Sequence, residues 1–200
     1  MLHINQRRFT CQAHVVFILL MVLIPFDVLA QSPAEQVLLA RARRALRAFK
    51  QRDAASLAAL THPTKGVRFS PYGYVLVERE RVLTRQQVRR LFTDRRRYAW
   101  GEDDATGETL KLSGRQYIAR RVYDHDFLRA PQVFYNQVVF GGTTMPNNVA
   151  EAYPHAVFVT FHFPNTNPEG AQDWTSLCLG FEEHHGKWYL VAVVHNVWTI

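Results

Sequence analysis

The chain has 200 residues, with 24 Lys+Arg against 17 Asp+Glu and an apolar content of 48%. No segment is low in complexity and no internal repeat is visible, so the composition argues against a disordered or a repeat protein. The formal net charge of +7 indicates either a solvated basic surface or attraction to an anionic partner.

The first 30 residues have the three parts of a secretory signal peptide in the expected order. Arg7 and Arg8 form a positive region, residues 15–25 form an apolar run, and Ala30 ends a cleavage site. The run of about a dozen residues is shorter than the roughly 20 that a membrane-spanning helix needs. We therefore expect residues 1–30 to be removed, and the protein to be exported to the periplasm or the extracellular space.

Removal of this segment leaves residues 31–200 as a single domain with 22 basic and 16 acidic residues, a net charge of +6, and one cysteine, Cys178. One cysteine cannot form an internal disulfide, so the core alone must hold this domain together. No lipid-attachment cysteine follows the apolar run, and we expect no membrane span after cleavage. Nucleic acid is a poor partner for an exported protein, which leaves a solvated face or an anionic envelope ligand to explain the charge.

Two helices are predicted at the start of this domain. Residues 34–51 have helical periodicity, and Asp53 caps a second helix that ends at about Leu60. Short strands are expected at 67–70 and 74–78. The apolar stripe of the first helix consists of Leu39, Ala42, Leu46 and Phe49.

Two capping boxes predict the next helices. Thr84 with Gln87 begins a helix that runs to about residue 93, and Ser113 with Gln116 begins one that runs to about residue 123. Between them, residues 95–112 read as a strand–turn–strand segment or a long ordered loop around an acidic turn.

The last third of the chain is rich in strands. They are expected at 133–140, 156–163, 174–183 and 188–199, and a hairpin turn at 184–187 joins the last two. Helices first and a terminal antiparallel sheet last predict an α+β fold, with N-terminal helices packed on the sheet.

Six segments carry a resemblance to a known family: HPTKGVRFSPYGYV (62–75), YAWGEDDATGETLKLS (98–113), YDHDF (123–127), FHFP (161–164), DWTSLCLGF (173–181) and KWYLVAVVHNVWTI (187–200). Together they resemble uncharacterised bacterial secreted proteins and lipoproteins. The resemblance implies a curved antiparallel sheet of the NTF2-like (cystatin-like) kind, and it implies no established activity. Lipoprotein relatives carry a cysteine where this chain has Ala30.

The last hairpin predicts a candidate pocket. A two-residue loop at His185 and Gly186 would place Ser176 opposite His195 and Cys178 opposite Val193. Because side chains alternate along a strand, one sheet face would then carry small residues and leave room above it. The side chains expected to line this pocket are His162, Thr160, Ser176, Cys178 and His195, with Asp126 nearby.

Several chemistries are open to these residues. A histidine near its unperturbed pKa of about 6.5 can act as a general acid or base, and Cys178 beside His195 would suit nucleophilic catalysis. A structural histidine and a small buried cysteine are the stronger interpretation. Asp124, His125 and Asp126 suggest a metal site, but adjacent strand residues point in opposite directions, and we expect neither metal nor cofactor.

The leading hypothesis is therefore a non-enzymatic exported domain that binds a small molecule or an envelope partner. The first alternative is an envelope hydrolase that uses His195 or His162 as its base, alone or with Asp126, although the chain contains no known catalytic motif. The second alternative is a structural interaction protein that uses the basic face of the first helix, at Arg43, Arg44 and Arg47.

Overall fold

The structure, a computed structural model, describes residues 31–141, 147–166 and 172–197. The expected signal peptide lies outside these residues, while residues 31–200 form one compact unit. Among the described residues, no helix combines the length and the apolar character that a membrane span requires.

The first two helices form where the caps and the apolar spacing predict them. α1 spans Pro33–Gln51, and its apolar stripe is buried. The Ser32 side chain caps α1 by accepting a hydrogen bond from the Glu35 amide. α2 spans Ala54–Leu60, and the Asp53 carboxylate accepts a hydrogen bond from the Ser56 amide. Both helices therefore start at a polar side chain that satisfies a free amide.

Both capping boxes are confirmed, but the helices behind them are shorter than predicted. α3 is a single turn, Arg85–Val88, followed by irregular turns to residue 93. α4 spans Gly114–Arg121. The short elements η1 (Phe127–Arg129) and α5 (Val149–Ala152) had no clear cap in the sequence.

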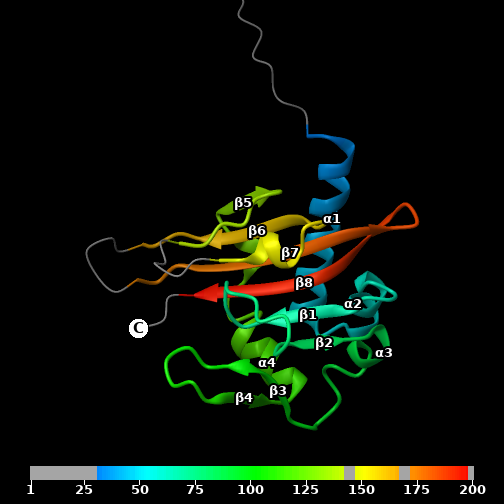
Figure 1. Ribbon diagram of the computed structural model, residues 1–200. Coiled ribbons are helices and arrows are strands. Elements are labelled where there is room, and N and C mark those ends of the chain that lie inside the picture. Colours follow the sequence, from blue (N-terminus) through cyan, green and yellow to red (C-terminus); the bar gives the residue numbers. More distant parts are fainter. Residues whose placement is uncertain (1–30, 142–146, 167–171, 198–200) are drawn as a thin grey trace, which may run out of the picture. The chain divides into compact units, whose positions relative to one another are not determined.

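Six strands form one mixed sheet in the order β2-β1-β8-β7-β6-β5 (Figure 1). A separate two-stranded sheet, β3 (Tyr98–Glu102) with β4 (Thr109–Leu112), confirms the predicted strand–turn–strand segment. The strands of the large sheet are β1 (Val67–Ser70), β2 (Arg81–Leu83), β5 (Gln132–Tyr135), β6 (Val157–Phe163), β7 (Thr175–His184) and β8 (Lys187–Val197).

Two strand predictions are corrected. The sheet is not wholly antiparallel, because β1 lies parallel to β8, the last strand of the chain. Such a pairing joins segments far apart in sequence, so no local pattern announces it. Residues 74–78 form no strand: the Arg79 and Glu80 amides both donate to the Leu76 carbonyl and close a turn. The antiparallel partner of β1 is instead β2.

The predicted hairpin between β7 and β8 is present, but a bulge changes its register. His184 pairs with Lys187 and Phe181 with Leu190, as a two-residue loop requires. Gly180 then pairs with Ala192, so Val191 is an extra residue in β8. Beyond the bulge every pair is shifted by one residue, which exchanges the two faces of β8.

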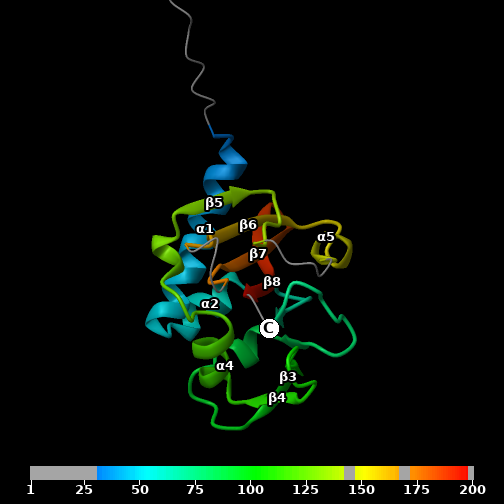
Figure 2. The same ribbon diagram turned by 90° about the vertical axis from the view of Figure 1, so that its left-hand side faces the viewer.

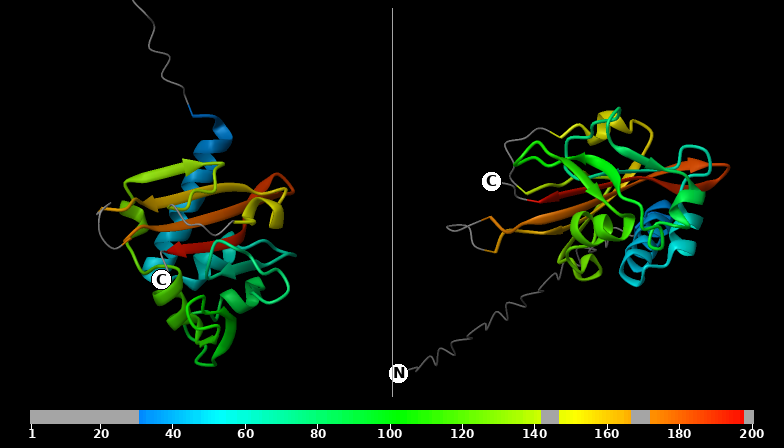
Figure 3. Two further views of the ribbon diagram at one scale, coloured as in Figure 1. Left: turned by 60° about the vertical axis from the view of Figure 1, so that its left-hand side comes forward. Right: turned by 90° about the horizontal axis from the view of Figure 1, so that it is seen from below.

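Helices cover one face of the large sheet and α5 lies on the other (Figures 2 and 3). The larger core lies under α1, α2 and α4 and includes Phe69, Phe161 and Leu179. The smaller core lies toward α5 and includes Val149 and Cys178. Both faces of β7 and β8 are buried, which is why these strands are apolar on both sides.

An aromatic stack connects the small sheet to α4. The Trp100 and Tyr117 rings are parallel within 10°, with centroids 4.1 Å apart, and Phe69 meets both rings edge-on. The Trp100 indole donates to the Leu112 carbonyl over 2.8 Å. The Tyr117 hydroxyl is buried and has no hydrogen-bond partner among the described residues.

We expect Tyr117→Phe to keep or raise the free energy of unfolding by about 1 kcal/mol, because it removes an unpaired buried hydroxyl and keeps the stacked ring. Tyr117→Ala is the matched control and should cost about 3–5 kcal/mol, because it removes the ring and leaves a cavity. Urea unfolding of the three proteins measures both effects. A Phe variant less stable than the parent by more than about 1 kcal/mol would show that the hydroxyl is satisfied.

Candidate functional site

Four of the six predicted pocket residues share one sheet face. Thr160 pairs with Cys178 and His162 with Ser176 across β6 and β7. His162 Nδ1 lies 2.7 Å from Ser176 Oγ, and the Thr160 hydroxyl donates to the Gln137 carbonyl. All four are buried, and none lines a described cavity. Burial raises the pKa of Cys178 to about 12 and lowers that of His162. Both side chains are therefore kept in their neutral forms, which favours a structural role over a catalytic one.

His195 and Asp126 lie elsewhere. The bulge at Val191 pairs His195 with Leu177, so its side chain lies on the helix-covered face, where its ring meets Phe127 edge-on. The predicted pairing of His195 with Ser176 is therefore wrong. Asp126 binds Lys50 Nζ at 2.7 Å and accepts a hydrogen bond from the Tyr123 hydroxyl.

The carboxylate that contacts a candidate histidine is Asp124. Asp124 Oδ1 lies 3.1 Å from His195 Nε2, and Thr175 Oγ1 lies 3.2 Å from the same nitrogen. Burial opposes ionisation of Asp124, but hydrogen bonds and charges from His195 and His125 outweigh it and lower its pKa to about 2. The His195 side chain is 1% exposed, whereas that of Asp124 is 23% exposed, so the contact lies just under the surface with the imidazole buried. Among the described residues, no group of three or more potential metal ligands converges.

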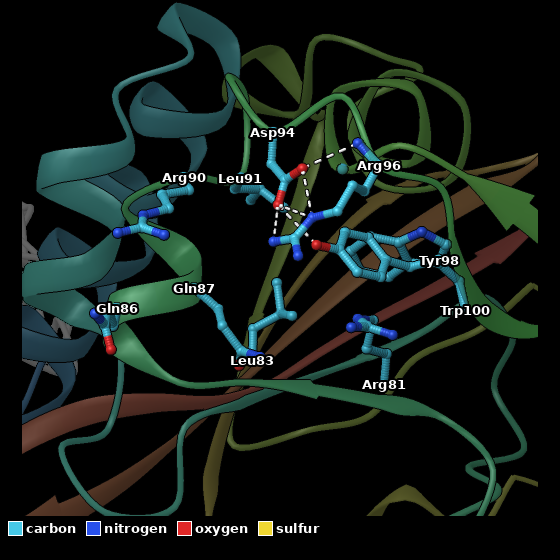
Figure 4. A pocket seen from close by; sticks show the side chains of 11 residues that line it. Arg81, Leu83, Gln86, Gln87, Arg90, Leu91, Asp94, Arg96, Tyr98 and Trp100 are labelled. Carbon is cyan, nitrogen blue, oxygen red and sulfur yellow. Dashed lines mark hydrogen bonds and ion pairs between the residues drawn. The ribbon is translucent and has the colours of Figure 1, made fainter.

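A different part of the chain forms a cavity with concentrated charge. This anion cavity, about 410 Å³ in volume, lies between β2, α3, the loop that follows α3, and β3 (Figure 4). Apolar and charged side chains are interspersed around it. The residues that line it are Arg81, Leu83, Gln86, Gln87, Arg90, Leu91, Asp94, Arg96, Tyr98, Trp100 and Gly114.

The one carboxylate of the anion cavity is already neutralised. Asp94 receives three hydrogen bonds of 2.7–3.1 Å from the Arg96 guanidinium and one of 2.7 Å from the Tyr98 hydroxyl. These bonds, those from Arg96 first, hold the pKa of Asp94 well below its usual range. Asp94 is thus ionised and engaged, and it has no capacity to serve as a base or as the partner of another cation.

Arg81 has no such partner. Its guanidinium carbon lies 3.9 Å from the centre of the Tyr98 ring and 5.9 Å from that of Trp100. Its Nε is buried without a hydrogen-bond partner among the described residues. Burial lowers the pKa of Arg81, yet an arginine stays charged at neutral pH. The negative charge of Asp94 offsets part of this burial, but a partly buried cation without a hydrogen-bonded anion is costly, so this position favours a bound anion.

A second cavity, of about 310 Å³, has the opposite charge. Glu80, Asp103 and Asp104 line it, and Arg121 Nη2 holds Asp103 at 2.6 Å. Burial raises the pKa of Glu80, whose carboxylate accepts a hydrogen bond from the Ser70 hydroxyl. Neighbouring side chains therefore bind the carboxylates of Glu80 and Asp103. Burial raises the pKa of Asp104, and the carboxylate of Asp104 has no hydrogen bond with a described residue.

The sequence interpretation missed the anion cavity, because it assigned the excess arginines to solvated helix faces. A signal was present in residues 95–100, where arginines are followed directly by Tyr98 and Trp100. Arginine stacks readily on aromatic rings. Arg81 lies on another strand, β2, so its position beside these rings could be seen only in the folded structure.

No protein-family model matches the chain, and comparisons with curated proteins and with solved structures likewise gave no match. The candidate site therefore depends on the geometry of this chain alone.

We expect Asp124→Asn to lower the free energy of unfolding at pH 7 by about 2 kcal/mol, since the folded pKa of about 2 lies below the unfolded value of 3.8. A depressed acid contributes stability above pH 4 and loses it as the pH falls toward 2. The difference between variant and parent should shrink over that window in urea titrations. Asp126→Asn, at an exposed ion pair, is the control and should change stability much less. A constant difference from pH 7 to pH 2 would contradict the Asp124–His195 contact.

Proposed function

We propose that residues 31–200 form a non-enzymatic binding domain for a small organic anion, which occupies the anion cavity. The observation that carries this proposal is Arg81, a cation whose Nε is buried without a partner beside a concave space. A volume of about 410 Å³ falls within the usual range of roughly 300–1,000 Å³ for small-molecule pockets.

The lining defines the chemistry of this anion. A carboxylate, sulfate or phosphate group would lie against Arg81, because a guanidinium group binds such groups through paired hydrogen bonds. The start of α4 at Gly114 adds the partial positive charge of a helix N-terminus. The apolar or planar body of the ligand would contact Leu83 and Leu91.

Binding explains the cavity better than catalysis does. Its described lining includes no histidine, cysteine or serine, and its carboxylate, Asp94, is fully engaged by Arg96 and Tyr98. The hydrolase alternative needs His195 or His162 to meet a substrate, and both are buried.

We further propose that the domain belongs to the NTF2-like class and is exported. N-terminal helices on one face of a six-stranded sheet are consistent with that class. The signal-peptide pattern of residues 1–30 supports export. An exported binding domain would meet its ligand in the periplasm or outside the cell.

The test is isothermal titration with d-galacturonate and phenyl phosphate, with d-galactose and phenol as the uncharged controls. We expect at least one anion to bind and neither neutral compound to do so. Arg81→Gln should weaken anion binding about tenfold or more, because a hydrogen bond to a charged group contributes about 1.5–3 kcal/mol.

The matched control is Arg44→Gln, an exposed residue of α1 outside the cavity, which removes the same charge and should leave the affinity unchanged. Equal affinity of the Arg81→Gln variant and the parent, or the absence of binding by both anions, would refute the proposed function.

A further inference from the structure

Two more hollows lie next to the anion cavity along α4. The second hollow, of about 630 Å³, shares Asp94 with the cavity, and the third, of about 110 Å³, shares Phe92 and Arg115 with the second. α4 follows all three, because Gly114 lines the cavity and Ala119 lines the third hollow. We call these three neighbouring hollows, taken together, the arginine groove.

Positive charge dominates the arginine groove from end to end. Within the part of the chain that the structure describes, eight basic side chains line it, of which Lys50 is paired with Asp126, and its one lining carboxylate is Asp94. Arg96 already neutralises that carboxylate. The side chains of Arg90, Arg95 and Arg115 make no hydrogen bond or ion pair with any described residue. A row of like charges repels itself, and an anion chain lying between them would relieve that repulsion.

The shape of the groove restricts the kind of partner. The groove is longer than a single small ligand, because α4 alone advances about 7.5 Å between Gly114 and Ala119 at 1.5 Å per residue. The half-buried ring of Phe92 lines the second and third hollows, whereas the Arg81 guanidinium lies over the ring of Tyr98. Aromatic rings offer flat apolar surfaces on which the apolar faces of sugar rings can lie.

A membrane surface fits the groove less well. Membrane-associated basic surfaces carry apolar side chains that enter the bilayer interface. The exposed large apolar side chains of the described chain line none of the three hollows: Val37, Tyr74, Leu76, Val77, Val82 and Val133.

We propose that the arginine groove binds an acidic polysaccharide, a linear chain with a carboxylate or sulfate on its sugar units. One charged unit occupies the anion cavity, and the following units lie past Arg95 and Arg115 toward Arg52. This inference rests on the proposed function, because the cavity is the first subsite of the groove.

The experiment measures affinity against chain length. Oligogalacturonates of one, two, four and eight units are titrated into the parent domain at fixed ionic strength, with heparin fragments as the sulfate arm and maltooligosaccharides as the uncharged control. We expect the dissociation constant to fall at least tenfold from one unit to eight in one of the charged series. Its salt dependence should grow with length, because more ion pairs form.

Two variants locate the effect. Arg81→Gln should weaken every length, because it alters the first subsite. The double variant Arg95→Gln/Arg115→Gln should weaken the eight-unit chain at least tenfold and the single unit far less. Arg44→Gln/Arg47→Gln on α1 removes the same two charges outside the groove and should retain the length dependence. Circular dichroism and thermal unfolding verify that each variant is folded.

The outcomes separate the two proposals. If neither the monosaccharide nor the oligomers bind the parent, this inference is overturned, and the proposed function fails with it when phenyl phosphate does not bind either. If the single unit binds and eight units bind no tighter, or if the gain survives in the Arg95→Gln/Arg115→Gln variant, only this inference is overturned. Single-stranded DNA of equal charge that binds more tightly than both acidic glycans would also overturn it.

Discussion

One additional residue in the last strand, Val191, determines what each side of the central sheet contains. β8 lies between β1 and β7, so its side chains contribute to both cores. Without the bulge, strict alternation from Leu190 would carry His195 to the face that holds Cys178. With the bulge, Val191 and Ala192 both contribute to the smaller core, and Val193 returns to the core under the helices. His195 follows Val193 and becomes a buried partner of Asp124.

This arrangement leaves little of the large sheet available for a ligand. Its two central strands are buried on both faces, and polar side chains there, such as His162 and Ser176, satisfy each other. Unpaired charge is instead found where β2, at the edge of the sheet, meets β3 and the loop after α3. An edge strand that packs against a loop leaves space that a packed core does not. That space is the anion cavity, and Arg81 of β2 lines it.

The sequence predicted the features that depend on near neighbours. Asp53, Thr84 and Ser113 cap helices as their spacing indicates, and the turn at His185 and Gly186 forms the hairpin. The bulge could not be predicted, because residues 190–194 read LVAVV and are apolar in either register. The parallel pairing of β1 with β8 joins segments over 100 residues apart. The candidate pocket depended on one register, so a shift of one residue separated His195 from the other members of the set.

The cost of burying positive charge gives a physical reason to prefer the arginine groove over the basic face of α1 as the anion-binding site. Exposed arginines on a helix are solvated by water, and their charge costs little. Arg81 is different, because its Nε is shielded from water by the Tyr98 ring and the cavity wall and has no described partner. The one nearby carboxylate could have neutralised it, yet Asp94 is bound to Arg96 and Tyr98. The charge of Asp94 offsets only part of the cost of burying Arg81, and no hydrogen bond satisfies the Arg81 Nε. An anion in the cavity would lower that remaining free-energy cost.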